Sequence, residues 1–192
     1  NCLFVKILFM LKLVSKIIFW LNGWTVTDSF KFPKKCVIIA APHTSNWDFL
    51  IGRCYGYITG ISVNYFIKSS FFIPIFGMFF RLNGGIPVFR DSNYNLVDIT
   101  VNRFKSSESF ILALSPEGTR SRVKKWKTGF YHIALKARVP IVLVAMDYKY
   151  KTVGVIDSIF PTGDIDSDMR IIEKQFKDLN GKISSNYNPR IM

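Results

Sequence analysis

The sequence predicts an α/β fold in which a mainly parallel central sheet is flanked by helices. Short apolar runs that are typical of buried strands alternate along the chain with longer segments that are typical of helices. In addition, 192 residues with 49% hydrophobic content suffice for one domain with a substantial core, but not for two. We therefore expect a single domain over residues 25–180, between an N-terminal helix at 1–24 and a loosely held C-terminal tail at 181–192.

Residues 1–24 are predicted to form an amphipathic helix that docks on a membrane interface. Lys6, Lys12 and Lys16 interrupt the apolar sequence, so no run reaches the roughly 20 residues of a transmembrane helix. On a helix the three lysines fall within a stripe about 120° wide, and apolar side chains surround the rest. A helix packed on the core and a cleaved signal peptide are the alternatives, although FWLNGWTV is a poor cleavage site.

The other elements follow in order along the chain. Strands are predicted at 36–42, 63–68, 84–89 and 109–114, with one long or two short strands at 140–156. Helices are predicted at 47–60, 71–82, 92–107, 128–138 and 166–179. In a parallel sheet, sites collect at the turns beyond the carboxyl ends of strands. The stretches 43–48 and 115–121 fall at such turns.

The charge of the chain favours an anionic partner. Its 26 lysines and arginines exceed its 13 acidic residues and give a net charge of +13, which suits nucleic acid, an anionic membrane surface or a phosphorylated substrate. Nucleic acid is disfavoured, because no binding motif is present and the cations adjoin apolar runs. The three cysteines lack the spacing of a zinc or redox motif, so no disulfide framework is predicted and a reducing, cytoplasmic setting fits.

The segment APHTSNWDFL places His43, one of only two histidines, five residues before Asp48. Residues five apart lie about 140° apart around a helix, so these two can meet only across a turn. With Ser45 as N-cap, Asp48 would stand at N3 and complete a capping box. In one interpretation Asp48 only caps and His43 has no chemical role. In the other, the carboxylate orients the imidazole, which then accepts a proton.

A nucleophile of the enzyme itself is not evident. The sequence has no G-x-S-x-G elbow, and no cysteine lies near either histidine along the chain. The hydroxyl that His43 would activate is therefore predicted to belong to the substrate, and transfer would take one direct step.

The turn SPEGTRS, residues 115–121, is a second candidate site. It follows a strand and exposes Glu117, Thr119 and Arg120 together with backbone N–H groups. From residue 120 to residue 138 the chain has seven basic residues and no acidic one, which favours a phosphate ligand. A solvated basic loop, in which Glu117 only pairs with a neighbouring arginine, is the alternative.

The segment 68–90 joins an aromatic, apolar run to Lys68, Arg81 and Arg90. Such a run most often belongs to the core. Alternatively it lines a groove for an acyl chain or enters lipid, with Arg90 at a head-group phosphate.

Four segments together resemble the sequence blocks of the glycerolipid acyltransferase family, which includes the 1-acylglycerol-3-phosphate acyltransferases. They are HTSNWD (43–48), GGIPVFR (84–90), SPEGTRS (115–121) and VPIVLVAMDY (139–148), in the order and spacing of the family. The resemblance implies transfer of a fatty acyl group from acyl-CoA or acyl carrier protein to the hydroxyl of a lysophospholipid, as in phospholipid biosynthesis. It implies no cofactor, no metal, and attachment to the cytoplasmic face of the cell membrane.

The resemblance also assigns roles to residues. His43 is expected to be the general base and Asp48 its orienting partner. Expected substrate-binding residues are Glu117, Gly118, Thr119 and Arg120, with Arg90 as a phosphate contact and Lys68 as a further candidate. Departures from the family pattern at Pro42 and Ser115 leave the acceptor open among lysophosphatidic acid, another lysophospholipid and a lysolipid without phosphate. A non-catalytic peripheral membrane protein is the competing interpretation, because lipid binding needs only the helix and the basic loop.

Overall fold

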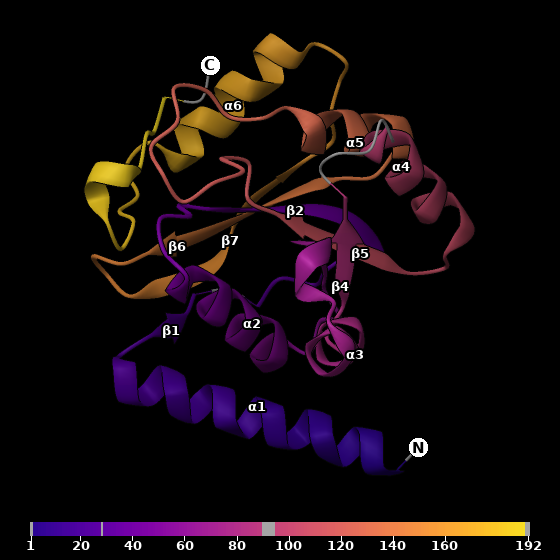
Figure 1. Ribbon diagram of the computed structural model, residues 1–192. Coiled ribbons are helices and arrows are strands. Elements are labelled where there is room, and N and C mark those ends of the chain that lie inside the picture. Colours follow the sequence, from indigo (N-terminus) through magenta and orange to yellow (C-terminus); the bar gives the residue numbers. More distant parts are fainter. Residues whose placement is uncertain (1, 28, 90–94, 191–192) are drawn as a thin grey trace.

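The computed structural model describes residues 2–27, 29–89 and 95–190 of the chain. They form one seven-stranded sheet with helices on both faces (Figure 1). The strand order is β1-β7-β6-β2-β5-β3-β4, and all neighbours are parallel except the antiparallel pair β6 and β7. The predicted α/β class with a mainly parallel sheet is therefore confirmed.

Each predicted segment contains an element of the predicted type, whereas the two-residue strand at 25–26 was not predicted. The strands are β1 (Thr25–Val26), β2 (Lys35–Ala41), β3 (Asn64–Lys68), β4 (Gly85–Val88), β5 (Phe110–Leu114), β6 (Ile141–Asp147) and β7 (Thr152–Ile159). The α-helices are α1 (Cys2–Asn22), α2 (Trp47–Thr59), α3 (Pro74–Leu82), α4 (Leu96–Ser106), α5 (Gly129–Ala137) and α6 (Ile165–Phe176), and short 3-10 helices span Ser69–Phe71 and Ser184–Asn186. The segment 140–156, which the sequence left as one or two strands, forms two.

The strand β2 shows why helices cover both faces. Val37 and Ile39 pack in a cluster with α5 and α6, whereas Cys36 and Ile38 pack in a second cluster with α1 and α2. Because side chains alternate along a strand, an unbroken apolar run buries both sides of β2. Figure 1 accordingly shows α4, α5 and α6 on one face of the sheet and α1, α2 and α3 on the other.

Parallel pairing brings the carboxyl ends of β2, β5 and β6 to one edge of the sheet. Ile39 of β2 pairs with Leu114 of β5, and Ala41 of β2 pairs with Ala145 of β6. The chain leaves these three central strands at residues 42, 115 and 148. These three departing segments therefore meet at the same edge.

The helix α1 has a packed side and an exposed apolar side. Phe19 and Ser15 are buried, and Phe19 joins the cluster with α2. Within residues 5–22 of α1, ten large apolar side chains are exposed: Val5, Ile7, Leu8, Phe9, Met10, Leu13, Val14, Ile17, Trp20 and Leu21. Among the described residues, no helix combines the length and apolar character needed to cross a membrane. Docking of α1 on a membrane stays a prediction.

The predicted cap of α2 is wrong by one residue. The N-cap is Asn46, and its side chain makes no capping hydrogen bond. Ser45 lies one position earlier, where its Oγ accepts from the backbone N–H of Trp47 at 3.1 Å. Asp48 consequently stands at the second helical position, and its carboxylate reaches back over the loop.

The C-terminal segment is not the loosely held tail that its polar sequence suggested. Tyr187 is 5% exposed within the cluster of α6, and its hydroxyl donates to the carbonyl of Phe176 at 2.8 Å. Arg122 donates to the carbonyl of Tyr187, and Asn188 donates to that of Val123. One buried aromatic ring, rather than a run of apolar residues, fixes the described part of this segment on the domain.

Candidate functional site

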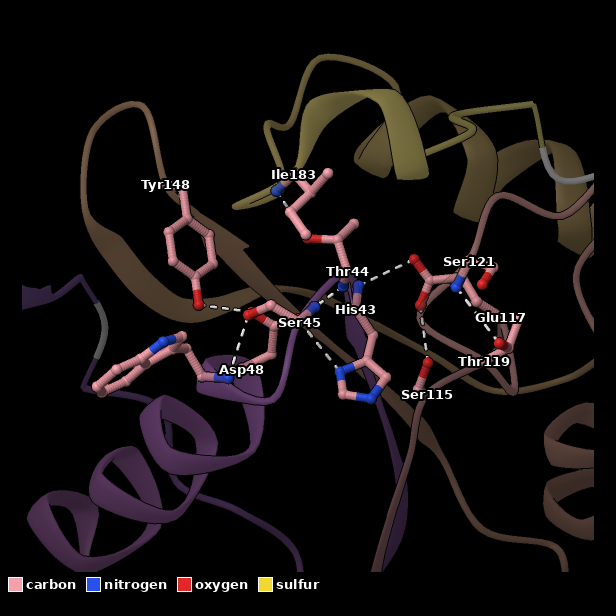
Figure 2. A network of polar contacts seen from close by, with 11 residues as sticks. His43, Thr44, Ser45, Asp48, Ser115, Glu117, Thr119, Ser121, Tyr148 and Ile183 are labelled. Carbon is pink, nitrogen blue, oxygen red and sulfur yellow. Dashed lines mark hydrogen bonds and ion pairs between the residues drawn. The ribbon is translucent and has the colours of Figure 1, made fainter.

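The loop after β2 brings His43 and Asp48 together at the carboxyl edge of the sheet (Figure 2). His43 Nδ1 lies 3.3 Å from Asp48 Oδ2, so the two side chains meet across the turn as predicted. The Asp48 side chain is fully buried, whereas 26% of the His43 side chain is exposed. In Figure 2 the Nε2 atom lies on the side of the ring that is turned away from Asp48. A buried carboxylate thus faces one nitrogen of an imidazole that reaches the surface.

Four further hydrogen bonds hold the Asp48 carboxylate. Oδ2 accepts from the backbone N–H groups of Thr44 at 2.6 Å and Ser45 at 2.7 Å. Oδ1 accepts from the hydroxyls of Tyr148 at 2.5 Å and Ser45 at 3.2 Å. Burial acts to raise the pKa of Asp48, but hydrogen bonds from His43, Tyr148 and the loop outweigh it and hold the pKa below its usual value. Asp48 is therefore ionised at neutral pH.

Glu117 supports the same loop from the end of β5. Its Oε1 accepts from the backbone N–H of His43 at 2.9 Å, and its Oε2 accepts from Ser115 Oγ at 2.7 Å. Glu117 is 3% exposed, and this burial raises its pKa although the two hydrogen bonds act to lower it. Its observed contacts are therefore with the His43 loop rather than with a neighbouring arginine. Contact of Glu117 with a substrate stays a prediction.

The other residues of the turn reach the surface. Gly118 has a φ of +67°, a left-handed conformation that favours glycine, and a Cβ there would lie 2.9 Å from the side chain of Lys127. Thr119 and Arg120 are exposed, and Thr119 Oγ1 accepts from the backbone N–H of Ser121 at 3.3 Å. The buried Glu117 and the exposed Arg120 thus divide the turn into a supporting part and a surface part.

The remaining predicted cations are Lys68 and Arg90. Lys68 is the exposed last residue of β3, which runs parallel to β5 and so ends at the same edge of the sheet. Arg90 lies outside the described residues. Within the described part of the chain, no group of three or more His, Cys, Asp or Glu side chains is arranged to hold a metal ion.

Two features of the site were not predicted. Tyr148, the residue after β6, donates to Asp48, and the backbone N–H of Ile183 donates to Thr44 Oγ1 at 3.2 Å (Figure 2). The position of Tyr148 directly after an apolar strand was the available signal, since loops after neighbouring parallel strands meet. Nothing in the local sequence showed that β6 lies beside β2.

Chemically, the site combines a proton acceptor with exposed cations. An imidazole held by a carboxylate can take a proton from a hydroxyl, and lysine or arginine can bind a nearby anionic group. The imidazole and the exposed cations lie at the same edge of the sheet.

Comparison with known sequences identifies similar proteins over most of the domain. The sequence profile named Acyltransferase matches residues 23–147. The 1-acyl-sn-glycerol-3-phosphate acyltransferases of Salmonella typhimurium and Escherichia coli K12 are each 32% identical over 115 residues, which cover 57% of this chain and 46% of each relative. The Saccharomyces cerevisiae protein of the same name is 28% identical over 139 residues, 68% of this chain and 45% of that protein. The chain thus spans about half the length of the curated relatives it matches.

The fold has a counterpart among solved structures. The crystal structure of PlsC, the 1-acyl-sn-glycerophosphate (LPA) acyltransferase from Thermotoga maritima, matches with a TM-score of 0.64, over 87% of this chain and 75% of that one. The sequence identity is 18%, so this match demonstrates a shared fold.

Proposed function

Because this chain belongs to the acyltransferase family, we propose that it transfers a fatty acyl group from acyl-CoA or acyl carrier protein to the hydroxyl of a lysophospholipid. The preferred acceptor is 1-acylglycerol-3-phosphate and the product is phosphatidic acid. The names of the bacterial relatives support this choice of acceptor. The observation that carries the proposal is the 3.3 Å contact between His43 and the buried Asp48 at the carboxyl edge of the sheet.

In the proposed mechanism the imidazole of His43 is the general base. Donation of Nδ1–H to Asp48 leaves a lone pair on Nε2, which accepts the proton of the acceptor hydroxyl as its oxygen attacks the thioester carbonyl carbon. A C–O ester bond forms, the C–S bond breaks, and the proton on Nε2 passes to the departing sulfur. The products are an ester and a free thiol, with no acyl-enzyme between them. General base catalysis of this kind supplies about 10²- to 10⁴-fold of the rate.

The cations at the same edge are proposed to bind the phosphate of the acceptor. Arg120 is exposed beside the supporting Glu117, and Lys68 is exposed at the end of β3. A guanidinium group binds phosphate with two parallel hydrogen bonds, which would also fix the orientation of the acceptor. Gly118, Thr119 and Arg90 are proposed to complete this surface.

The helix α1 is proposed to dock the protein on the anionic, cytoplasmic face of the cell membrane. Its exposed apolar side chains would enter the interface, while Lys6, Lys12 and Lys16 reach the head groups. Both the acceptor and the acyl chain of the product are membrane components, so docking brings the site to its substrate.

The test uses the purified protein with anionic vesicles that contain 1-acylglycerol-3-phosphate and a labelled long-chain acyl-CoA, and in parallel a labelled acyl carrier protein. We expect labelled phosphatidic acid and free thiol in equal amounts, both dependent on the acceptor. Parallel vesicles with another lysophospholipid, or with a lysolipid that lacks phosphate, identify the acceptor class. Vesicle binding without transfer from either donor to any of the three acceptors would contradict the proposal and favour a non-catalytic membrane protein.

A further inference from the structure

Tyr148 contacts the proposed catalytic pair but has no part in the mechanism above. It follows β6, and its hydroxyl donates to Asp48 Oδ1 at 2.5 Å (Figure 2). We propose that Tyr148 is a positioning residue for acyl transfer: it fixes the Asp48 carboxylate, and through it the orientation in which His43 accepts a proton. This inference rests on the proposed function of the site.

The two oxygens of Asp48 are held in different ways, and this makes the Tyr148 hydroxyl important. Oδ2 accepts from the N–H groups of Thr44 and Ser45, which belong to the same loop. Oδ1 accepts from hydroxyls, with Tyr148 at 2.5 Å and Ser45 at the longer distance of 3.2 Å. Without the Tyr148 hydroxyl, Oδ1 of a fully buried carboxylate keeps the longer contact alone. A buried carboxylate that lacks a donor turns or admits water, and either response moves the Oδ2 atom that faces His43.

Tyr148 is itself held by segments from both ends of the chain. The indole of Trp24, just after α1, packs edge-on against its ring at a centroid distance of 4.9 Å, and Trp24 is 7% exposed. The backbone N–H of Tyr148 donates to the carbonyl of Asn180 at 2.9 Å, and Lys182 Nζ lies 6.0 Å from the ring centroid. A ring fixed in this way can set the direction of its hydroxyl, as a positioning residue must.

A second tyrosine–aspartate hydrogen bond in the same chain provides a matched control. Tyr131 Oη donates to Asp168 Oδ2 at 2.8 Å, and both residues are buried. Asp168 also accepts from Thr162, and Tyr131 Oη accepts from the N–H of Gly163. The Tyr131 ring packs edge-on against His132 at a centroid distance of 5.8 Å, but no imidazole takes part in these hydrogen bonds. Loss of the Tyr131 hydroxyl therefore affects packing and stability without a route to His43.

The kinetic test compares Tyr148→Phe with Tyr131→Phe. We expect Tyr148→Phe to lower kcat roughly 10- to 100-fold, the effect of one hydrogen bond to a charged group. The KM values for acceptor and donor should change by less than about twofold. The removed hydroxyl donates to Asp48 and, in the proposed mechanism, to neither substrate. Tyr131→Phe should keep the wild-type kcat.

The pH profile provides a readout that a purely structural role would not move. The groups that face Asp48 are His43, Tyr148 and, through space, Glu117, while Lys182 lies over the Tyr148 ring. The hydrogen bond from Tyr148 is one of those that lower the pKa of Asp48. Its loss should raise that pKa, so the acidic limb of the kcat profile should move to higher pH. In Tyr131→Phe this limb should not move.

A further readout needs no turnover. The chain has only two histidines, so ¹⁵N-histidine spectra report His43 beside one further residue, His132. His132 is the internal reference for Tyr148→Phe, whereas in Tyr131→Phe its ring contacts the substituted residue. The ¹⁵N shifts of His43, which report which ring nitrogen carries the proton, should change in Tyr148→Phe and stay in place in Tyr131→Phe. 3-Fluorotyrosine is a stronger hydrogen-bond donor than tyrosine, so its incorporation at position 148 should move the His43 shifts in the opposite direction. This variant serves as the test if Tyr148→Phe folds poorly.

The outcomes separate this proposal from the proposed function. A folded Tyr148→Phe protein with wild-type kcat, pH profile and His43 ¹⁵N shifts would overturn the proposal. A loss of kcat equal to that in Tyr131→Phe would overturn it too, because weakened packing would then explain the effect. Absence of acyl transfer in the wild-type chain would instead overturn the proposed function and, with it, the part that Tyr148 plays in it.

Discussion

Asp48 and Asp168 are two buried aspartates that the same domain holds with similar contacts. Each accepts a hydrogen bond from a tyrosine hydroxyl and at least one from a backbone N–H. Asp48 also faces His43, whose side chain is 26% exposed, whereas Asp168 accepts from the hydroxyl of Thr162 at 3.1 Å. Both residues lie in the first turn of a helix, Asp48 in α2 and Asp168 in α6. The α2 helix begins just after the loop at the carboxyl edge of the sheet, and the Asp48 carboxylate accepts from the backbone of that loop.

Burial and hydrogen bonding of a carboxylate therefore do not identify a catalytic site. The donors to Asp168, which are Tyr131 and Thr162, fasten the start of α6 to its surroundings, and no imidazole is among them. Asp48 uses comparable contacts to orient a group that reaches solvent. The exposed imidazole and the position at the sheet edge distinguish the two.

The largest difference between the two aspartates should appear on substitution by asparagine. Asp48→Asn removes the charge that faces His43 and should lower kcat for acyl transfer by roughly 10²- to 10⁴-fold. Asp168→Asn should keep kcat close to wild type and lower the melting temperature. Initial rates on vesicles together with thermal melts check both results. Equal kcat losses in the two variants would show that a general loss of structure, rather than the contact with His43, is responsible.

Substitution of Glu117 should lower kcat less than substitution of Asp48, because Glu117 contacts the backbone N–H of His43 rather than its imidazole. In Glu117→Gln the amide oxygen can still accept from the His43 N–H, but the charge is lost, so we expect a roughly tenfold lower kcat. Glu108→Gln, an exposed glutamate before β5, is the matched control and should not change the rate. A larger loss than that in Asp48→Asn would assign Glu117 a direct part in the chemistry.

The stability that Asp48 contributes should depend on pH. Its pKa in the folded protein lies below the usual value of 3.8, so the unfolded chain binds its proton first. The stabilisation is therefore fully present above that value and is lost as the pH falls through the folded pKa, by about 1.4 kcal/mol for each unit of pKa difference. Denaturant titrations from about pH 6 to pH 2 should show the free-energy difference between wild type and Asp48→Asn shrinking towards acid. A difference that stays constant would contradict the lowered pKa.

The smallest expected effect is a loss of stability when the contact between Thr44 and the C-terminal segment is removed. Thr44 is 1% exposed, and its Oγ1 accepts from the N–H of Ile183, so Thr44→Val removes the acceptor of this part-buried hydrogen bond. We expect a loss of about 1 kcal/mol in the free energy of unfolding. The exposed Thr27→Val variant serves as control and should be neutral. Urea titrations of both variants measure the loss, and an unchanged Thr44→Val would mean that this bond contributes nothing to the attachment of the segment.

Features that depend on neighbouring residues could be predicted from the sequence. The apolar runs marked the strands because a strand buried on both faces has no polar alternation. His43 and Asp48 were paired because five residues across a turn bring their side chains together, although the cap itself was placed one residue early. The resemblance of the four blocks then assigned these two residues their chemistry.

Features that depend on strand order could not be predicted. Tyr148 bonds to Asp48 across 100 residues of chain, Glu117 bonds to His43 across 74, and Ile183 bonds to Thr44 across 139. Each contact requires knowing which strands and segments are neighbours, which local periodicity does not encode. The buried Tyr187 was missed for the same reason, since a single aromatic residue in a polar stretch does not show what covers it.

The most direct test of the central claim is single-turnover acyl transfer to 1-acylglycerol-3-phosphate in vesicles by His43→Ala, with the exposed His132→Ala as matched control. We expect His43→Ala to form ester at least about 10²-fold more slowly while binding the vesicles as the wild type does, and His132→Ala to react at the wild-type rate. Ester formation at the wild-type rate by His43→Ala would contradict the claim that this imidazole is the base.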